Sequence, residues 1–263
     1  MKIIFIAGDH PRHRFIAQVI HHTGYLSAII SEGRGPHVPE PGEQLEENLA
    51  DLFRYHFSLR EQREHQFFGN ADWPDCTHLP ITTDTLNSAE VQALLRNEPP
   101  DLLLTYGCHK LSDETLTYAN GECWNIHGGL SPWYKGAITH FWPSYMLEPQ
   151  MTGMTVHDLT NELDAGPVVH QCVAELVRGD GLHDLACRAV TKLAEELPQL
   201  IAKLAADEAI IKKYHKTSGK LWPGRDWRPE HLRLIYEVYG DRIVDHYLDD
   251  KFEKREPRLY RQF

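Results

Sequence analysis

The chain has 263 residues, of which 27 are Lys or Arg and 38 are Asp or Glu, so its formal net charge is −11. Proteins that bind nucleic acid usually present a basic surface to the phosphates, so a nucleic-acid partner is not expected. The hydrophobic content of 41% is typical of a globular protein. The sequence has no run of about 18 apolar residues, so we expect no membrane-spanning helix and no membrane partner.

Cysteine and histidine usage argues against disulfides and against a metal site. The five cysteines form an odd set without a C-x-x-C pair, which fits neither a disulfide framework nor a four-cysteine zinc site. Histidine is abundant, at 17 residues, but no pair has the H-E-x-x-H form. The apolar stretch at the N-terminus is too short for a signal sequence. We therefore expect a cytoplasmic protein without a bound metal.

The predicted elements begin with a strand over residues 3–7, an apolar run that the loop at 8–11 breaks. A helix follows, because apolar side chains recur at helical spacing over 15–20, and a second strand is predicted at 26–30. This alternation indicates a mostly parallel sheet covered by helices, with ligands bound at the carboxyl ends of the strands. Gly8 lacks the G-x-G-x-x-G context of a dinucleotide site.

The middle of the chain continues the alternation. Residues 44–68 are dense in Leu, Phe, Glu and Arg at helical periods, and we interpret them as a solvated amphipathic helix. A further helix is predicted over 88–97, with Ser88 in its first turn. Residues 101–106 then form a buried strand that ends at Gly107, which places a second loop at the same edge of the sheet.

The last third changes character. A strand is predicted over 168–177 and an amphipathic helix over 182–206, after which the regular alternation stops and one more helix is predicted over 230–248. The predicted fold class is therefore α/β, a Rossmann-like sheet with flanking helices. We expect a catalytic domain over 1–206 and a short C-terminal extension over 207–263 packed on it.

Three polar residues form a candidate catalytic set. Asn125 and His127 are two residues apart in an extended stretch, so their side chains point to one face. Acyl transfer needs a donor for the developing oxyanion and a group that accepts the proton of the attacking amine. Asp164 can orient the imidazole or relay protons. The alternative is structural: Asn125 caps a turn and His127 is a satisfied core residue.

The motifs around these residues resemble a known family. They are Asn-Ile-His-x-x-Leu-x-Pro-x-x-Lys-Gly at 125–136, Thr-Gly-Met-Thr-Val-His at 152–157 and Asp-x-Gly-Pro at 164–167, and the strand and loop at 100–112 are also similar. Over about residues 1–205 the chain resembles the N10-formyltetrahydrofolate-dependent formyltransferase superfamily. That superfamily includes glycinamide ribonucleotide transformylase, methionyl-tRNA formyltransferase and the sugar N-formyltransferases.

The resemblance implies an enzyme, an N-formyltransferase that uses N10-formyltetrahydrofolate as co-substrate. Asn125, His127 and Asp164 would then be catalytic, with Asn125 and protonated His127 stabilising the oxyanion. The folate pocket would be formed by Cys108, His109, Lys110, Leu111, Leu159 and Asp164. For Cys108 and Leu111 the alternative is core packing, and for His109 and Lys110 it is a solvated loop.

Departures from the family concern the acceptor. The loop at 8–14 is not the Gly-Ser-Asn phosphate loop of the purine enzyme, and the extension is shorter than the extra domain of the tRNA enzyme. A nucleotide-linked aminosugar, GDP- or dTDP-linked as in O-antigen biosynthesis, is therefore the expected acceptor. The alternatives are another small amine, such as a glycinamide ribonucleotide-like or hydroxyornithine-like one, and a folate or nucleotide sensor without catalysis. The oligomeric state is left open, with a homodimer as one option.

The predicted acceptor contacts are cations and rings at the strand ends. Phosphates would meet Arg12, Arg14 and Lys135, and a base would stack on Tyr134, Trp222 or Trp227, unless the two tryptophans only fasten the extension to the core. The predicted substrate-binding residues are Gly8, Asp9, His10, Arg12, Arg14, Tyr134, Lys135 and Trp222. Because both ligands are anionic, we expect Arg12, Arg14, Lys110 and Lys135 to form one positive island on an otherwise acidic protein.

Overall fold

The computed structural model describes residues 1–33, 35–160 and 162–263. Its centre is a seven-stranded sheet in the order β3-β2-β1-β4-β5-β7-β8, in which the first five strands are parallel and β7 and β8 run antiparallel to their neighbours. These strands are β1 Ile3–Gly8, β2 Leu26–Gly33, β3 Thr77–Thr82, β4 Leu102–Tyr106, β5 Glu122–His127, β7 Gly153–Asp158 and β8 Val168–Val173. The order reverses at β1, so the carboxyl ends of β1 and β4 flank a switch point where α/β sheets bind ligands.

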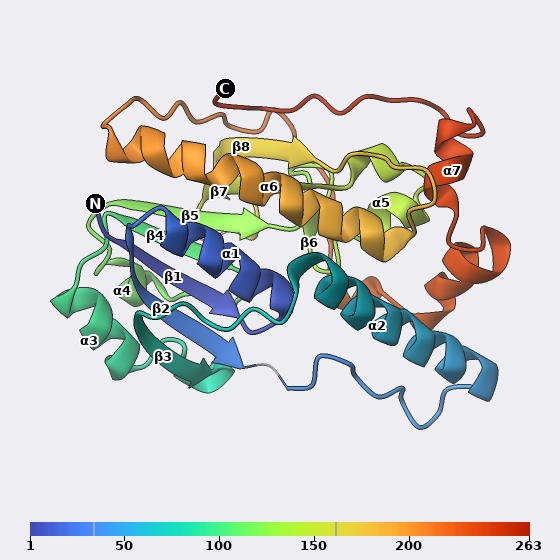
Figure 1. Cartoon of the computed structure of the whole chain (residues 1–263), viewed down its shortest axis with the longest axis horizontal. Coiled ribbons are helices and arrows are strands. Elements are labelled where there is room, and N and C mark those ends of the chain that lie inside the picture. The colour runs from blue at the N-terminus through green and yellow to red at the C-terminus, as the bar shows by residue number, and fades with distance from the viewer. Residues whose placement is uncertain (34, 161) are drawn as a thin grey trace.

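Helices cover both faces of the sheet (Figure 1). One face packs against α1 Pro11–His22, α2 Glu47–Phe68 and α6 Leu182–Ala205, and the other against α3 Ala89–Asn97 and the short α4 Asp113–Leu116. The side chains of β1 divide between the two cores by strand alternation, with Phe5 in the first and Ile4 in the second. α2 projects past the carboxyl ends of β1 and β2 (Figure 1), and this projection lets it form one wall of the cavity at that edge.

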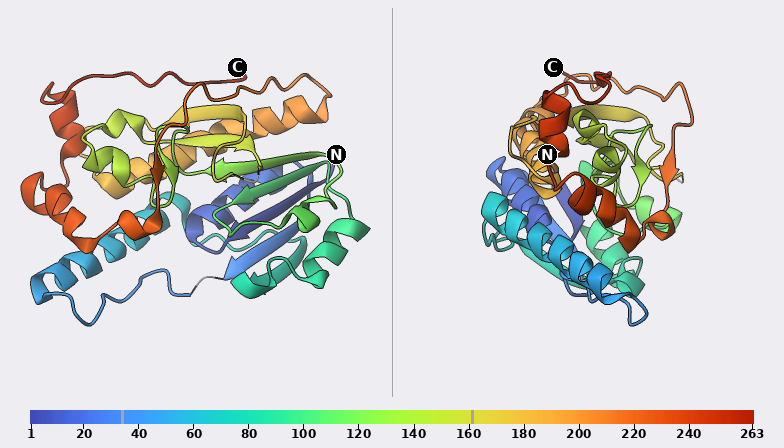
Figure 2. Two further views of the ribbon diagram at one scale, coloured as in Figure 1. Left: turned by 180° about the vertical axis from the view of Figure 1, so that it is seen from behind. Right: turned by 90° about the vertical axis from the view of Figure 1, so that its right-hand side faces the viewer.

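The segment after α6 packs on the sheet and on the loops beyond β5. A second, small sheet joins β6 Lys135–Gly136 to β9 Leu221–Trp222, and a separate apolar cluster unites the 130–151 region with α7 Ile243–Leu248 and the turns before it. The last residues follow the outer edge of β8 (Figure 2), where the Gln171 N–H donates to the Tyr260 carbonyl at 2.7 Å. The unpaired edge of β8 is thus covered by the chain itself.

The α/β fold class and the predicted parallel strands are confirmed, and Ser88 caps α3 by accepting from the Val91 N–H. Three predicted boundaries are wrong: α2 begins at Glu47 rather than at residue 44, β8 ends at Val173 rather than at 177, and the helix over 230–248 is interrupted. It divides into a 3-10 turn Pro229–His231, a π-helical turn Leu234–Val238 and α7, because Gly240 and Asp241 both adopt positive φ angles.

The remaining helical elements are short. They are α5 Trp142–Tyr145 and the 3-10 turns Thr83–Thr85, Pro149–Met151 and Gly224–Asp226. Within the described ranges of the chain, no helix is long and apolar enough to span a membrane.

Candidate active site

A cavity of about 620 Å³ opens at the carboxyl ends of β4 and β5. One part of its wall comes from the loop after β4 and the segment after β7, and includes Leu111, Leu116 and Leu159. The other part comes from α1, α2, α6 and the 136–141 loop. Asn125, His127 and Asp164 line the same cavity, so the three residues predicted to act together converge despite their separation in sequence.

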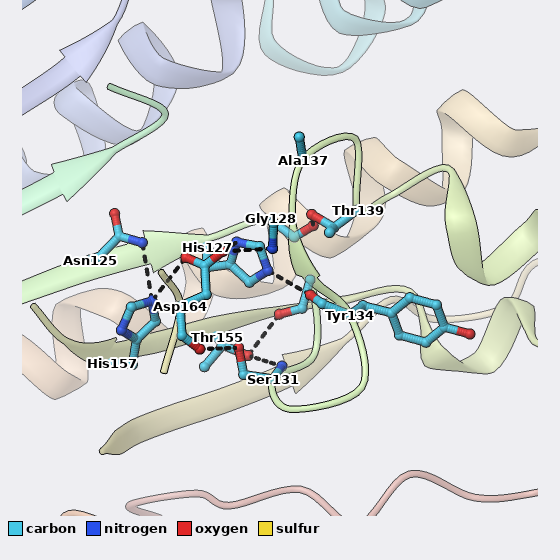
Figure 3. A network of polar contacts seen from close by, with 12 residues as sticks. Asn125, His127, Gly128, Ser131, Tyr134, Ala137, Thr139, Thr155, His157 and Asp164 are labelled. Carbon is cyan, nitrogen blue, oxygen red and sulfur yellow. Dashed lines mark hydrogen bonds and ion pairs between the residues drawn. The ribbon is translucent and has the colours of Figure 1, made fainter. Parts of the chain in front are cut away.

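The Asn125 side chain contacts residues of both neighbouring strands, and Figure 3 shows its contact with His157. Thr105 is the register partner of Asn125 on β4, and its hydroxyl donates to Asn125 Oδ1 at 2.8 Å. The amide nitrogen is therefore on the opposite side, 3.1 Å from His157 Nε2 on β7. His157 Nδ1 is 2.8 Å from the Asp158 carbonyl, so Nδ1 holds the proton and Nε2 accepts from Asn125. One amide hydrogen is thus engaged and the second remains for a ligand.

His127 is buried and held at both ring nitrogens. Nε2 lies 2.6 Å from the Tyr134 carbonyl, which can only accept, so Nε2 holds a proton. Nδ1 lies 3.4 Å from Asp164 Oδ2. Burial lowers the pKa of His127, and it outweighs the opposing attraction of Asp164. The resting ring is therefore neutral near pH 7, with its Nδ1 lone pair facing a carboxylate.

Asp164 joins the two histidines. Its Oδ1 lies 3.4 Å from His157 Nε2, and its Oδ2 accepts the Gly136 N–H at 2.8 Å (Figure 3). Although burial alone would raise its pKa, the nearby rings of His127 and His157 and the hydrogen bond from the Gly136 N–H lower it below the ordinary value. The carboxylate is therefore ionised at neutral pH. The backbone of Asp164 has φ 47°, a left-handed conformation that Asp adopts more readily than most residues.

The residues predicted to form a folate pocket all line the cavity: Cys108, His109, Lys110, Leu111, Leu159 and Asp164. Leu111 is also part of the core beneath α3 and α4, so core packing and cavity lining coexist at that side chain. The His109 N–H and ring both contact the buried carboxylate of Glu32. The loop after β4 is therefore tied to β2.

Gly8 at the end of β1, and Asp9 and His10 in the loop after it, do not line the cavity, so their predicted contacts with the acceptor stay predictions. The His10 ring stacks on His37 with ring centres 4.4 Å apart, and Asp9 lies 3.5 Å from the His37 ring. A Cβ atom at Gly8 would come within 2.8 Å of the His13 ring. Asp9 and His10 thus contact His37. The absence of a side chain at Gly8 leaves space for the His13 ring, which lines the cavity.

Tyr134 and Trp222 are structural in this fold rather than open to a substrate base. Tyr134 is 2% exposed and its hydroxyl donates to Glu148 at 2.7 Å. Trp222 is 7% exposed, stacks on Trp142 with centres 4.6 Å apart and donates its indole N–H to the Trp133 carbonyl. The prediction that these two rings stack on a ligand is corrected, and the alternative holds for Trp222, which fastens the extension to the core.

The expected positive island does not form as predicted. Arg12 and Lys110 line the cavity, whereas Arg14 and Lys135 do not. The Arg14 guanidinium packs over the Trp73 ring, 5.7 Å from its centre, and Lys135 lies in β6 beside β9. Their predicted contacts with substrate phosphates stay predictions, without support from the cavity lining.

Sequence reasoning missed the contribution of α2, interpreted above as a solvated helix. His56, Arg60 and Glu64 recur every four residues, so one face of the helix presents all three to the cavity. The sequence did contain a signal for this face: polar residues four apart lie on the side of the helix that also has buried phenylalanines. Thr105 and His157 were also missed, because their roles depend on strand register.

Within the part of the chain that the structure describes, no group of three or more His, Cys, Asp or Glu side chains could hold a metal ion. Asn125, His127, His157 and Asp164 supply the cavity with an amide donor, two imidazoles and a carboxylate.

Solved structures with this fold include formyltransferases of two kinds. The N-formyltransferase from Helicobacter canadensis, in complex with folinic acid and dTDP-3-aminofucose, aligns with a TM-score of 0.57 and 14% identity over 91% of this chain and 82% of that one. The phosphoribosylglycinamide formyltransferase of Anaplasma phagocytophilum aligns with a TM-score of 0.56 and 18% identity, over 85% of this chain and 98% of that one. At these identities the likeness shows the fold.

Sequence comparison shows the family. Methionyl-tRNA formyltransferase of Thermotoga maritima is 28% identical over 186 residues, which is 68% of this chain and 54% of that protein, so the chain spans about half the length of this curated relative. The formyl transferase family model matches residues 60–216, more than half of the chain and all of the candidate catalytic set. The chain belongs to the formyl transferase family.

Proposed function

We propose that this protein transfers a formyl group from N10-formyltetrahydrofolate to the amine of a nucleotide-linked aminosugar. The observation that supports it most is the convergence of Asn125, His127 and Asp164 in one cavity with two different walls. A transferase needs its reacting groups between two ligands, and the set lies where the two walls meet. Family membership favours formyl transfer over other acyl transfers.

The apolar wall suits the folate. Leu111, Leu116 and Leu159 offer apolar contact to a ring system, and residues 107–110 of the loop after β4 line the same part of the cavity. When bound, N10-formyltetrahydrofolate supplies the formyl carbon, which forms a bond to the acceptor nitrogen as its bond to N10 breaks.

Asn125 is the principal donor to the oxyanion in this proposal. Its amide is held by Thr105 and His157, so the second N–H needs no reorientation when negative charge develops. The sequence suggested that protonated His127 shares this role. The contact of Nε2 with the Tyr134 carbonyl and the lowered pKa of His127 favour a different role for that ring.

His127 and Asp164 manage the proton lost by the amine. The open acceptor on the ring is Nδ1, and a proton placed there lies beside Asp164 Oδ2. The ion pair that forms stabilises the charged ring, and the proton can then pass to the departing nitrogen. The amine must be neutral to attack, so activity falls as pH drops.

The second wall supports a nucleotide-linked acceptor. Phe57, Phe141 and Trp227 form an aromatic group there, with ring centres of Phe57 and Phe141 each 6.0 Å from Trp227. Two arginines, Arg12 and Arg60, line the same wall. Rings beside cations are the chemistry that binds a base and phosphates.

An acceptor panel tests the proposal. The purified protein is given N10-formyltetrahydrofolate with dTDP- and GDP-linked 3- and 4-aminosugars, a free aminosugar, glycinamide ribonucleotide, hydroxyornithine and methionyl-tRNA. We expect saturable turnover with a nucleotide-linked aminosugar and little with the free one. Preferential turnover of any other acceptor would replace the proposed substrate, and no turnover with any amine alongside tight folate binding would favour a sensor.

A further inference from the structure

Two arginines approach each other at the wall of the cavity formed by α1 and α2. Arg12 lies in the first turn of α1 and Arg60 in the middle of α2, and both line the cavity next to His13 and Tyr106. Of these two arginines, the sequence analysis named only Arg12 as a phosphate contact. Arg60 reaches the site because α2 projects past the ends of the strands (Figure 1).

Among the described residues, only one of the two guanidinium groups is paired with a carboxylate. Arg12 Nη1 donates to Glu64 Oε1, one turn of α2 beyond Arg60. Glu64 is 5% exposed, and its Oε2 atom has no hydrogen-bond partner within the described ranges. Arg60 donates to the His37 carbonyl and packs over the Phe57 ring, 4.8 Å from its centre, and no ion pair of Arg60 occurs within those ranges. The wall therefore has one cation more than it has anions.

The titration of the two groups agrees with this imbalance. Burial and the charge of Arg12 together lower the pKa of Arg60 to about 10, against the opposing attraction of Glu64 and Glu61. For Arg12 burial also acts to lower the pKa, but the attraction of Glu64 and Tyr106 outweighs it and the pKa is raised. Glu64 thus satisfies Arg12, whereas the charge of Arg60 is left partly desolvated beside a like charge. A second anion at this position would relieve that repulsion.

We infer that Arg60, with Arg12 beside it, binds a phosphate or diphosphate group of the acceptor. Guanidinium groups on two helices can donate hydrogen bonds to one tetrahedral anion from two directions, which a single arginine cannot do. Glu64 holds Arg12 in position, so Arg60 is the residue with its charge available. The inference rests on the proposed function for the identity of the acceptor, but anion binding itself can be measured without turnover.

Binding of inorganic pyrophosphate tests the site directly. Arg60→Gln removes the charge, Arg60→Lys keeps the charge but not the fork, and Arg54→Gln removes a charge from an exposed position of the same helix, where Arg54 pairs with Asp51. Affinity is followed by calorimetry and by the fluorescence of Trp227, which lines the same wall. Arg12 is replaced only by Lys, because its full removal would leave Glu64 buried without a partner.

We expect Arg60→Gln to weaken pyrophosphate binding by about 10- to 100-fold, Arg60→Lys to weaken it less, and Arg54→Gln to leave it unchanged. Folinic acid affinity should stay the same in all of them. Equal pyrophosphate affinity in Arg60→Gln and Arg54→Gln would overturn the inference. So would a loss of folinic acid affinity in Arg60→Gln, since the site would then hold a carboxylate of the folate.

The two proposals fail in different ways. If pyrophosphate binding depends on Arg60 but no nucleotide-linked aminosugar is formylated, the anion site stands and the proposed substrate is wrong. If such a sugar is formylated with the same KM in Arg60→Gln and in the wild type, the proposed function stands and the role of Arg60 is wrong. If a nucleoside diphosphate binds more tightly than pyrophosphate, the aromatic side chains of this wall contribute to nucleotide affinity as well.

Discussion

Thr105 and Asn125 are register partners on adjacent parallel strands, and the Thr105 hydroxyl donates to Asn125 Oδ1 at 2.8 Å. A side-chain amide can rotate by 180° about its terminal bond, which would exchange its oxygen and nitrogen. The bond from the hydroxyl to Oδ1, together with the contact of the amide nitrogen with His157 Nε2, stabilises one of the two orientations. Thr105 is thus a positioning residue, acting through Asn125 rather than on a substrate.

Thr105→Val should therefore reduce kcat by about 10- to 100-fold, because an amide without its fixed partner loses part of its donation to the oxyanion. KM for the folate should change little. Thr105→Ser restores the hydroxyl and should recover most of the rate, which a purely structural role of the methyl group would not explain. Steady-state kinetics of both variants checks this, and unchanged kcat in Thr105→Val would contradict the role.

Asp164→Asn separates charge from shape at the centre of the site. Asn adopts the left-handed conformation required at φ 47° and can still accept the Gly136 N–H, so the loop should keep its form. What is lost is the negative charge beside His127 Nδ1. We expect kcat to fall by about 10²- to 10⁴-fold, the usual contribution of acid–base catalysis. Folinic acid binding, measured by calorimetry, should be retained; a near-wild-type rate would exclude the proposed proton route.

Local sequence patterns predicted the fold better than they predicted the site. The apolar run over residues 3–7 and the helical spacing of apolar residues over 182–206 depend only on neighbours in sequence, and the structure has a strand and a helix there. The face that α2 turns to the cavity depends on how far the helix extends beyond the sheet, which is a tertiary property (Figure 1). Trp222 could not be placed either, because its partner Trp142 is 80 residues away and belongs to no regular pattern.

Ile138 holds backbone strain at the cavity. It has φ 57°, which is a genuine outlier for a β-branched residue, and its side chain lines the cavity while 44% exposed. Its neighbours fix the loop: the Ala137 N–H donates to the Trp222 carbonyl at 2.9 Å, and the Thr139 hydroxyl donates to the Gly128 carbonyl at 2.5 Å. Strain retained at an exposed side chain indicates a functional contact.

Ile138→Gly should relieve this strain and raise the free energy of unfolding by about 1 kcal/mol. At the same time it should raise KM for one of the two substrates, because a cavity-lining apolar contact is lost. Asp207→Gly is the control, since Asp207 also has a positive φ, of 53°, but does not line the cavity. Urea unfolding and steady-state kinetics measure the two effects. A variant that is more stable and kinetically normal would leave Ile138 without a role in binding.

The buried histidines at the cavity should make the protein sensitive to acid. Burial lowers the pKa of His56 and of His140 to about 3, from an ordinary value of 6.5. Below pH 6.5 the unfolded chain takes up protons at these rings while the folded chain does not, so stability is complete above 6.5 and is lost as the pH falls toward 3. Each such histidine contributes a loss of about 1.4 kcal/mol per pH unit in that window.

Urea unfolding at pH 7.5 and at pH 5 should therefore differ by roughly 2–4 kcal/mol from these two rings together. His56→Phe removes one titrating ring and should reduce the difference by about 1–2 kcal/mol, even if the variant is less stable at both pH values through the loss of the contact with Tyr236. His65→Gln, at an exposed position of the same helix, should leave the difference unchanged. An equal pH dependence in wild type and His56→Phe would mean that His56 is protonated in the folded protein, which would add a further positive charge to the wall that Arg12 and Arg60 line.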